Sequence, residues 1–236
     1  MNSNKYSDNN KRNALLGFLG GVAFMIGDCL LYIYPGRYPA EDIDPVFAAM
    51  PAWRFTASAF LGILGMALML FGFQSLYAMT REVCGKGMQR FMLIGGAGVA
   101  GVALAHFNLG SLLPLTYKAV IGAGGTAEMA ADTCRAMSDW VTPIDIVLIA
   151  ALYVQLIVLL YMILSGRSGL SKWFVLVGPF GAVAVGLLWS IVFRNTPLAA
   201  GWGSCESLGE GLMYLAAYAY WNMPGSGIEP GFLRQR

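Results

Sequence analysis

Two glutamates four residues apart, Glu206 and Glu210, open the last long apolar segment of the sequence. Residues at positions i and i+4 share one face of a helix, and Tyr214 and Tyr218 continue that face. An ionisable residue inside a membrane-spanning helix costs free energy and by default indicates a site or a pathway. The spacing therefore predicts a polar wall along this helix, with Glu210 as its deeper acid.

Two other apolar segments carry Asp28 and His106, the single histidine of the chain. With a rise of about 1.5 Å per residue, Asp28, His106 and Glu210 each lie roughly 9–10 Å below the outer ends of their predicted helices. A histidine beside carboxylates can exchange protons near neutral pH. We therefore expect these three residues to form one layer and to act as catalytic acids and bases.

Further polar residues are predicted nearer the outer mouth, and each has a structural alternative. Asp145 follows Thr142 in a capping box, and Glu206 is a first-turn acid, so both suit a helix start. A cation in the first turn, such as Arg54, indicates a carboxylate partner. His106 could itself be a hydrogen-bonded core residue. The candidate substrate-binding residues are Arg54, Asn108, Asp145, Glu206 and Tyr214.

The chemistry of this layer stays open in two respects. One imidazole with carboxylates suits a divalent metal, so His106, Asp28 and Glu210 are also candidate metal ligands, although no fixed metal-binding motif is present. Cys134 and Cys205 both fall on the predicted outer side, where an oxidising environment permits a disulfide. We take that disulfide as a candidate.

The composition indicates lipid as the main solvent of the chain. Its 236 residues are 57% hydrophobic and 12% charged, whereas soluble domains average about 25% charged residues. Several apolar runs exceed the roughly 18 residues that mark a membrane span. The sequence therefore predicts an all-α integral membrane bundle of six helices. The predicted spans cover residues 14–34, 51–79, 91–113, 143–164, 173–193 and 204–222.

The segments between the spans are short, with two exceptions. Residues 35–50 are polar, and Asp44–Pro45 predicts a short interfacial helix over 45–50. Residues 114–142 form the longest loop, in which an apolar stripe recurs at helical spacing (Met129, Thr133, Met137, Trp140). This stripe predicts a short amphipathic helix on the membrane surface before Pro143 opens the fourth span.

The distribution of basic residues predicts the orientation. Of the 15 Lys and Arg residues, ten lie on the side of the two termini and five on the other. Cytoplasmic loops carry the excess of Lys and Arg. We therefore expect a plasma (inner) membrane protein whose polar start, 1–13, and tail, 223–236, are both cytoplasmic.

Two motif classes are set aside. Residues 96–101 match a glycine-rich dinucleotide motif, but they lie inside a predicted span, where small residues provide close helix packing. No basic cluster interleaved with aromatic residues indicates nucleic-acid binding.

Three functions are compatible with these features. The first is a membrane-embedded enzyme whose outward-facing pocket acts on a lipid or amphipathic small molecule. The second is a small proton- or cation-coupled transporter, and the third is a non-catalytic assembly subunit in which the polar layer holds helices together. Membrane lipid is the expected surrounding partner in all three.

Overall fold

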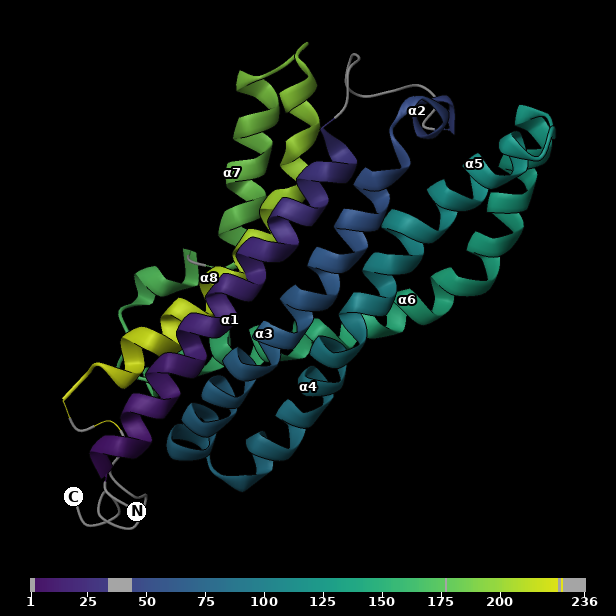
Figure 1. Ribbon diagram of the computed structural model, residues 1–236. Coiled ribbons are helices and arrows are strands. Elements are labelled where there is room, and N and C mark those ends of the chain that lie inside the picture. Colours follow the sequence, from purple (N-terminus) through teal and green to yellow (C-terminus); the bar gives the residue numbers. More distant parts are fainter. Residues whose placement is uncertain (1–2, 34–43, 177, 225, 227–236) are drawn as a thin grey trace.

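The computed structural model describes residues 3–33, 44–176, 178–224 and 226, and within these residues every regular element is a helix (Figure 1). Four helical stretches are long and apolar enough to cross a membrane: α1, α3, the continuous run from α4 to α5, and α6. The predicted all-α membrane class is confirmed at this level. The elements are α1 (Ser3–Tyr32), α2 (Asp44–Ala49), α3 (Ala52–Cys84), α4 (Lys86–Phe107), η1 (Asn108–Leu112), α5 (Leu113–Gly122), α6 (Ala127–Leu164), η2 (Lys172–Leu176), α7 (Pro179–Val192), η3 (Pro197–Gly203) and α8 (Ser204–Trp221).

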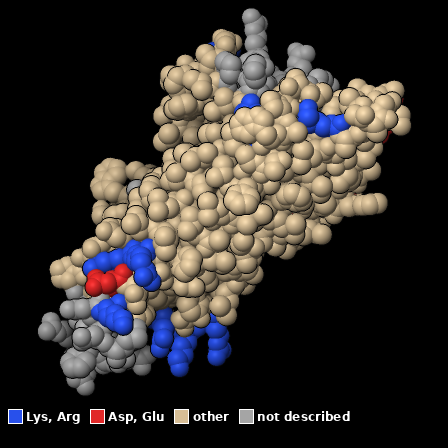
Figure 2. All heavy atoms as spheres, viewed as in Figure 1, with Lys and Arg blue, Asp and Glu red and all other residues tan. Residues whose placement is uncertain are grey.

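The surface of the bundle is apolar along its middle. On the face shown in Figure 2, Lys and Arg gather at the two ends, and the band between them lacks charged side chains. Large apolar side chains such as Phe60, Ile146 and Leu188 are more than half exposed. Apolar side chains exposed in this way are stable against hydrocarbon, so the band fits a membrane interior.

Helix α1 packs against α3 on one side and α8 on the other. A Cβ atom added to Gly17 would lie 2.5 Å from Cα of Gly72 on α3, and one added to Gly21 would lie 2.3 Å from Cα of Gly211 on α8. Small residues let membrane helices approach closely, and Gly17 and Gly21 do so here. These contacts hold the polar residues of α1 and α8 beside each other.

Helices α4 and α6 form the second closely packed pair. A Cβ atom at Gly98 would lie only 2.1 Å from the backbone nitrogen of Leu152. The glycine-rich stretch 96–101 therefore serves helix packing, as predicted, because its small residues let the α6 backbone come close.

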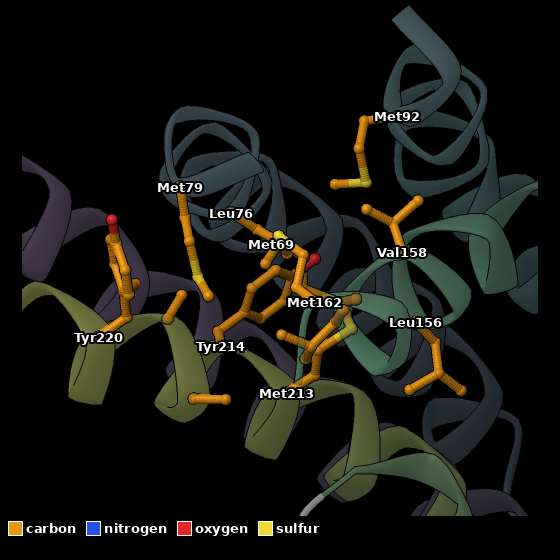
Figure 3. Close-up of a cluster of buried hydrophobic side chains, with 14 of the residues drawn as sticks. Met69, Leu76, Met79, Met92, Leu156, Val158, Met162, Met213, Tyr214 and Tyr220 are labelled. Carbon is orange, nitrogen blue, oxygen red and sulfur yellow. The ribbon is translucent and has the colours of Figure 1, made fainter. Parts of the chain in front are cut away.

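The main apolar core lies toward the end of the bundle where α1 begins and α8 ends (Figures 1 and 3). Met69 and Met79 of α3, Met162 of α6, and Met213 and Tyr214 of α8 converge there and are fully buried. Methionine fills irregular gaps between helices well. This core closes one half of the bundle, and Asp28, His106 and Glu210 lie in the other half.

The predicted surface helix in the loop 114–142 is wrong, because that segment belongs to the long helices. The chain continues from α4 through the π-helical turn η1 into α5, and α6 begins at Ala127 instead of Pro143. Thr126 caps α6 by accepting a hydrogen bond from the backbone of Met129. Pro143 lies inside α6, which bends along its length, as helices that contain proline commonly do (Figure 1).

Other boundaries differ less. The interfacial helix expected over 45–50 corresponds to α2, and the sixth predicted span corresponds to α8. The fifth is divided into η2 and α7. Pro179 starts α7, and a Cβ atom at Gly181 would lie 1.8 Å from the carbonyl oxygen of Leu176, so glycine is required at this break. Helix α1 begins at Ser3, so most of the polar start 1–13 is helical. Most of the loop 35–50 and of the tail 223–236 lies outside the described residues.

Candidate functional site

A pocket of about 650 Å³ lies in the half of the bundle away from the main core. Ligand sites commonly have volumes of roughly 300–1,000 Å³. Its walls come from α1, α4, α6, α7 and α8, with residues of α2, η1, α5 and η3 at their edges. The polar lining comprises Asp28, His106, Glu206, Ser207 and Glu210, and the apolar lining includes Val102, Leu109, Ile149, Leu152 and Val183. The pocket is therefore amphipathic.

Asp28 and His106 form the centre of the polar wall. Nδ1 of His106 lies 3.3 Å from Oδ1 of Asp28, and both side chains are about nine-tenths buried. Phe24 packs edge-on against the imidazole, and a Cβ atom at Gly62 would lie 2.5 Å from its Cδ2. The ring therefore occupies space that only glycine at position 62 leaves open, and the predicted proximity of Asp28 and His106 is confirmed.

Two serines complete this network, and sequence reasoning missed both. Ser207 Oγ donates to Oδ2 of Asp28, so both oxygens of that carboxylate have partners. Ser58 Oγ lies 2.9 Å from Nε2 of His106, and the backbone oxygen of Ser58 lies 3.2 Å from the same nitrogen. Helical periodicity could have indicated both serines. Ser207 shares a helical face with Glu210, and Ser58 belongs to the face of α3 that carries small residues.

The order Ser58, His106, Asp28 resembles that of a serine-hydrolase triad, with Nε2 of the histidine toward the serine and Nδ1 toward the aspartate, but the aspartate end faces the pocket. Ser58 is fully buried between helices and does not line the pocket. A nucleophile must meet its substrate, so this arrangement does not make Ser58 one. Asp28 and His106 are the members that reach the pocket.

Glu206 and Glu210 lie on the same wall in a different setting. Glu210 is 7% exposed and Glu206 is half-buried. Among the described residues, neither carboxyl group has a hydrogen-bond or ion-pair partner. A buried polar group without a partner carries a free-energy cost, which structural roles seldom justify. Glu210 therefore needs an explanation that packing alone does not supply.

Arg54 does not enter this acidic wall. Its Nη2 donates to the backbone oxygen of Ile33, directly after the last residue of α1. A cation there satisfies an unpaired carbonyl and suits the negative end of the helix dipole. Arg54 therefore binds the end of α1 and not the carboxylate that we expected. It does not line the pocket.

Three other predicted residues lie outside the pocket lining. Tyr214 is buried in the main core, where its hydroxyl lies 3.1 Å from Oε1 of Gln155. Asn108 and Asp145 pair with each other: Nδ2 of Asn108 donates to Oδ1 of Asp145 at 2.9 Å. Asp145 is 1% exposed and lies inside α6, so the capping role expected for it is wrong.

The predicted disulfide is not formed. The sulfur of Cys134 donates to the backbone oxygen of Leu113 where α6 packs on α5, while Cys205 packs against Gly186 of α7. The two cysteines belong to different packed groups of helices.

The described residues also contain no group of three or more His, Cys, Asp and Glu side chains arranged to hold a metal ion. His106, Asp28 and Glu210 line one pocket without converging on a common point, so the predicted ligand set is not assembled.

Residues 1–223 match DUF6796, a family of unknown function, and the chain therefore belongs to that family. No curated protein and no solved structure is significantly similar to it. The pocket itself must therefore carry the functional assignment.

Proposed function

We propose that this member of DUF6796 is a membrane-embedded enzyme that acts on a lipid or other amphipathic small molecule by acid/base chemistry. The observation that carries the proposal is the pairing of Asp28 with His106 at the wall of an amphipathic pocket, beside Glu210, which has no partner among the described residues. Ionisable groups gathered in one pocket and held in a fixed geometry are typical of catalytic sites.

The acids would divide the work. Asp28 is held by His106 and Ser207, so its carboxylate has a fixed position from which it can accept a proton from the substrate. Glu210 has no such donor and can give its proton to a leaving group. Two carboxyl groups in different settings commonly take the base and acid roles. His106 would orient Asp28, and Ser58 would hold the imidazole in that position.

The shape of the bundle favours an enzyme over a transporter. The polar wall ends where the apolar core begins, and that core closes the half of the bundle beyond Glu210 (Figure 3). The polar pair buried there, Tyr214 and Gln155, is internally satisfied. A transporter requires alternating access from both sides to one site, so an apolar closure of this depth suits a site that serves one side.

We further propose the finer topology of six spans in the plasma membrane with both termini cytoplasmic. Helix α7 has 14 residues and α8 has 18, which correspond to roughly 21 and 27 Å. They form an antiparallel hairpin beside α1, and α1 begins at the same end of the bundle as α8 finishes (Figure 1). That end carries most of the basic residues visible in Figure 2, as the positive-inside rule requires.

The catalytic proposal is tested with purified protein in vesicles made from a total lipid extract of the expression host. Mass spectrometry follows the lipid masses before and after incubation. We expect the wild-type protein to convert at least one lipid species, and Asp28→Asn to lower that rate about 10²–10⁴-fold, because it removes the base. Asp132→Asn is the matched control, since Asp132 is exposed and pairs with Arg135 at the surface. Equal rates for wild type and Asp28→Asn, or no conversion by either, would contradict the proposal.

A further inference from the structure

The charge of the pocket lining is one-sided. Asp28, Glu206 and Glu210 contribute three carboxyl groups, and none of the described lining residues is Lys or Arg. His106 is the single basic side chain at this wall, and its Nδ1 is engaged by Asp28. Arg54, for which the sequence predicts a carboxylate partner, donates to the backbone at the end of α1 instead. Among the described residues, the pocket lining therefore contains more acidic than basic side chains.

Glu210 supplies an independent observation. Its side chain is more than nine-tenths buried, lines the pocket and has no hydrogen-bond or ion-pair partner among the described residues. Buried carboxyl groups normally have a hydrogen-bond or ion-pair partner, because the loss of their hydration is otherwise uncompensated. A group in the pocket that donates hydrogen bonds or carries positive charge would supply the missing partner.

The remaining lining agrees with such a ligand. Phe24, Tyr32 and Trp202 line the same pocket, and aromatic rings attract cations, quaternary ammonium groups included. The lining also has an aliphatic part, with Ile149 and Leu152 of α6 and Val183 of α7. Helix α6 packs on α4 and α5, whereas α7 packs on α8 and η3, so this aliphatic part spans two separate packed groups.

We infer that the ligand of this pocket is a cationic amphiphile, whose positively charged nitrogen lies against Glu206 and Glu210 and whose hydrocarbon chain lies along Ile149, Leu152 and Val183. This inference rests on the proposed function and names its substrate class. An amine head group also fits the acid/base role, because its nitrogen can exchange a proton with Glu210.

The test compares probes of equal chain length and different charge. The full-length protein in micelles of an uncharged detergent is titrated at neutral pH with dodecylamine, 1-dodecanol or dodecanoate, and native mass spectrometry counts the bound probe. Tetramethylammonium, which has the charge without the chain, separates an amphiphile from a free cation. We expect dodecylamine to bind at least about tenfold more tightly than each of the other three probes.

The variants locate the effect. Glu206→Gln and Glu210→Gln are isosteric changes that should each reduce the preference for dodecylamine over 1-dodecanol by roughly tenfold. Glu128→Gln is the matched control, because Glu128 is exposed in the first turn of α6 and should leave the preference unchanged. The comparison of probes on the wild-type protein needs no variant, so it stands even where a variant misfolds.

Each other outcome has a defined meaning. Equal or tighter binding of 1-dodecanol or dodecanoate overturns the cationic head group but leaves an amphiphile pocket, and with it the enzyme proposal. Equal binding of tetramethylammonium overturns the requirement for a chain. Absence of binding by all three chain-bearing probes overturns both the ligand class and the amphipathic substrate of the proposed function.

Discussion

At the scale of single residues, the site depends on space as much as on charge. His106 reaches Asp28 because Gly62 on α3 has no side chain, and Phe24 closes the other side of the ring. Ser58 and Ser207 then complete the hydrogen bonds of the pair. Buried polar networks of this kind are stable only when their members are mutually satisfied. Glu210 lines the pocket without a partner among the described residues, and so it is the residue that indicates a ligand.

Substitution of Gly62 tests this dependence on space. In Gly62→Ala the new methyl group would lie 2.5 Å from Cδ2 of His106, so the ring must leave its present position beside Asp28. We expect a loss of roughly 1–3 kcal/mol in the free energy of unfolding, as for other overpacked positions. Since His106 is the only histidine, ¹⁵N-histidine labelling with a histidine-free affinity tag gives one set of imidazole signals, and these should change.

The control for this prediction is Gly87→Ala. A Cβ atom at Gly87 would have no neighbour within 4 Å, and the change should leave the imidazole signals where they are. Identical imidazole signals in wild type and Gly62→Ala would show that the ring is not confined as described.

At the scale of the elements, two closely packed groups of helices form the pocket between them. Helices α7, α8, α1 and α3 pack in succession, and α4 packs with α6 and is joined to the first group through α3. The glycine contacts set how closely the members of each group approach. The π-helical turn η1 lets α4 continue into α5 while its residues Leu109 and Gly110 line the pocket. Such π turns frequently occur at functional sites.

Substitution of Gly98 tests the second group. In Gly98→Ala the added carbon would lie 2.1 Å from the backbone nitrogen of Leu152, which cannot rotate away as a side chain can. Helices α4 and α6 must separate, and we expect a loss of about 1–3 kcal/mol in stability. Thermal unfolding in detergent measures this loss.

Gly87→Ala serves as the control here too, because alanine favours a helix more than glycine does. That variant should be as stable as the wild type or slightly more so. A Gly98→Ala protein as stable as Gly87→Ala would show that α4 and α6 do not pack through this glycine.

At the scale of the whole molecule, the bundle has two unequal halves. One is filled by methionine, leucine and aromatic side chains (Figure 3). The other holds the amphipathic pocket. The junction between α3 and α4, with Arg81, Lys86 and Arg90, lies at the end of the bundle that the apolar core closes (Figure 1). The turn between α5 and α6 lies at the opposite end (Figure 1). With the proposed orientation, the pocket opens toward the outer half of the membrane.

Cysteine labelling tests that orientation. In a background with the four native cysteines changed to serine, single cysteines are placed at Gly87 and at Gly122, two exposed glycines without close neighbours. In intact cells a membrane-impermeant maleimide should label Gly122→Cys and should label Gly87→Cys only after the cells are opened. The reverse pattern would invert the topology, and labelling of both in intact cells would contradict a single orientation.

The sequence by itself determined the class of the protein and the approximate position of several of its helices. Apolar runs, helical spacing and the scarcity of charge depend on local chemistry, and they predicted an all-α membrane bundle and the position of α8 closely. They also placed Asp28 and His106 at one depth, because depth follows from the rise along each helix.

Only the tertiary structure decided which side chains meet. The rotation of each helix about its axis and the glycine contacts between helices direct Arg54 to the end of α1, pair Asn108 with Asp145, bury Tyr214 in the core and keep Cys134 away from Cys205. Periodicity describes one helix at a time, so it contains neither the rotation of a helix relative to its neighbours nor the contacts between helices. For the same reason, the finding that Glu210 faces a pocket without a partner required the packed bundle.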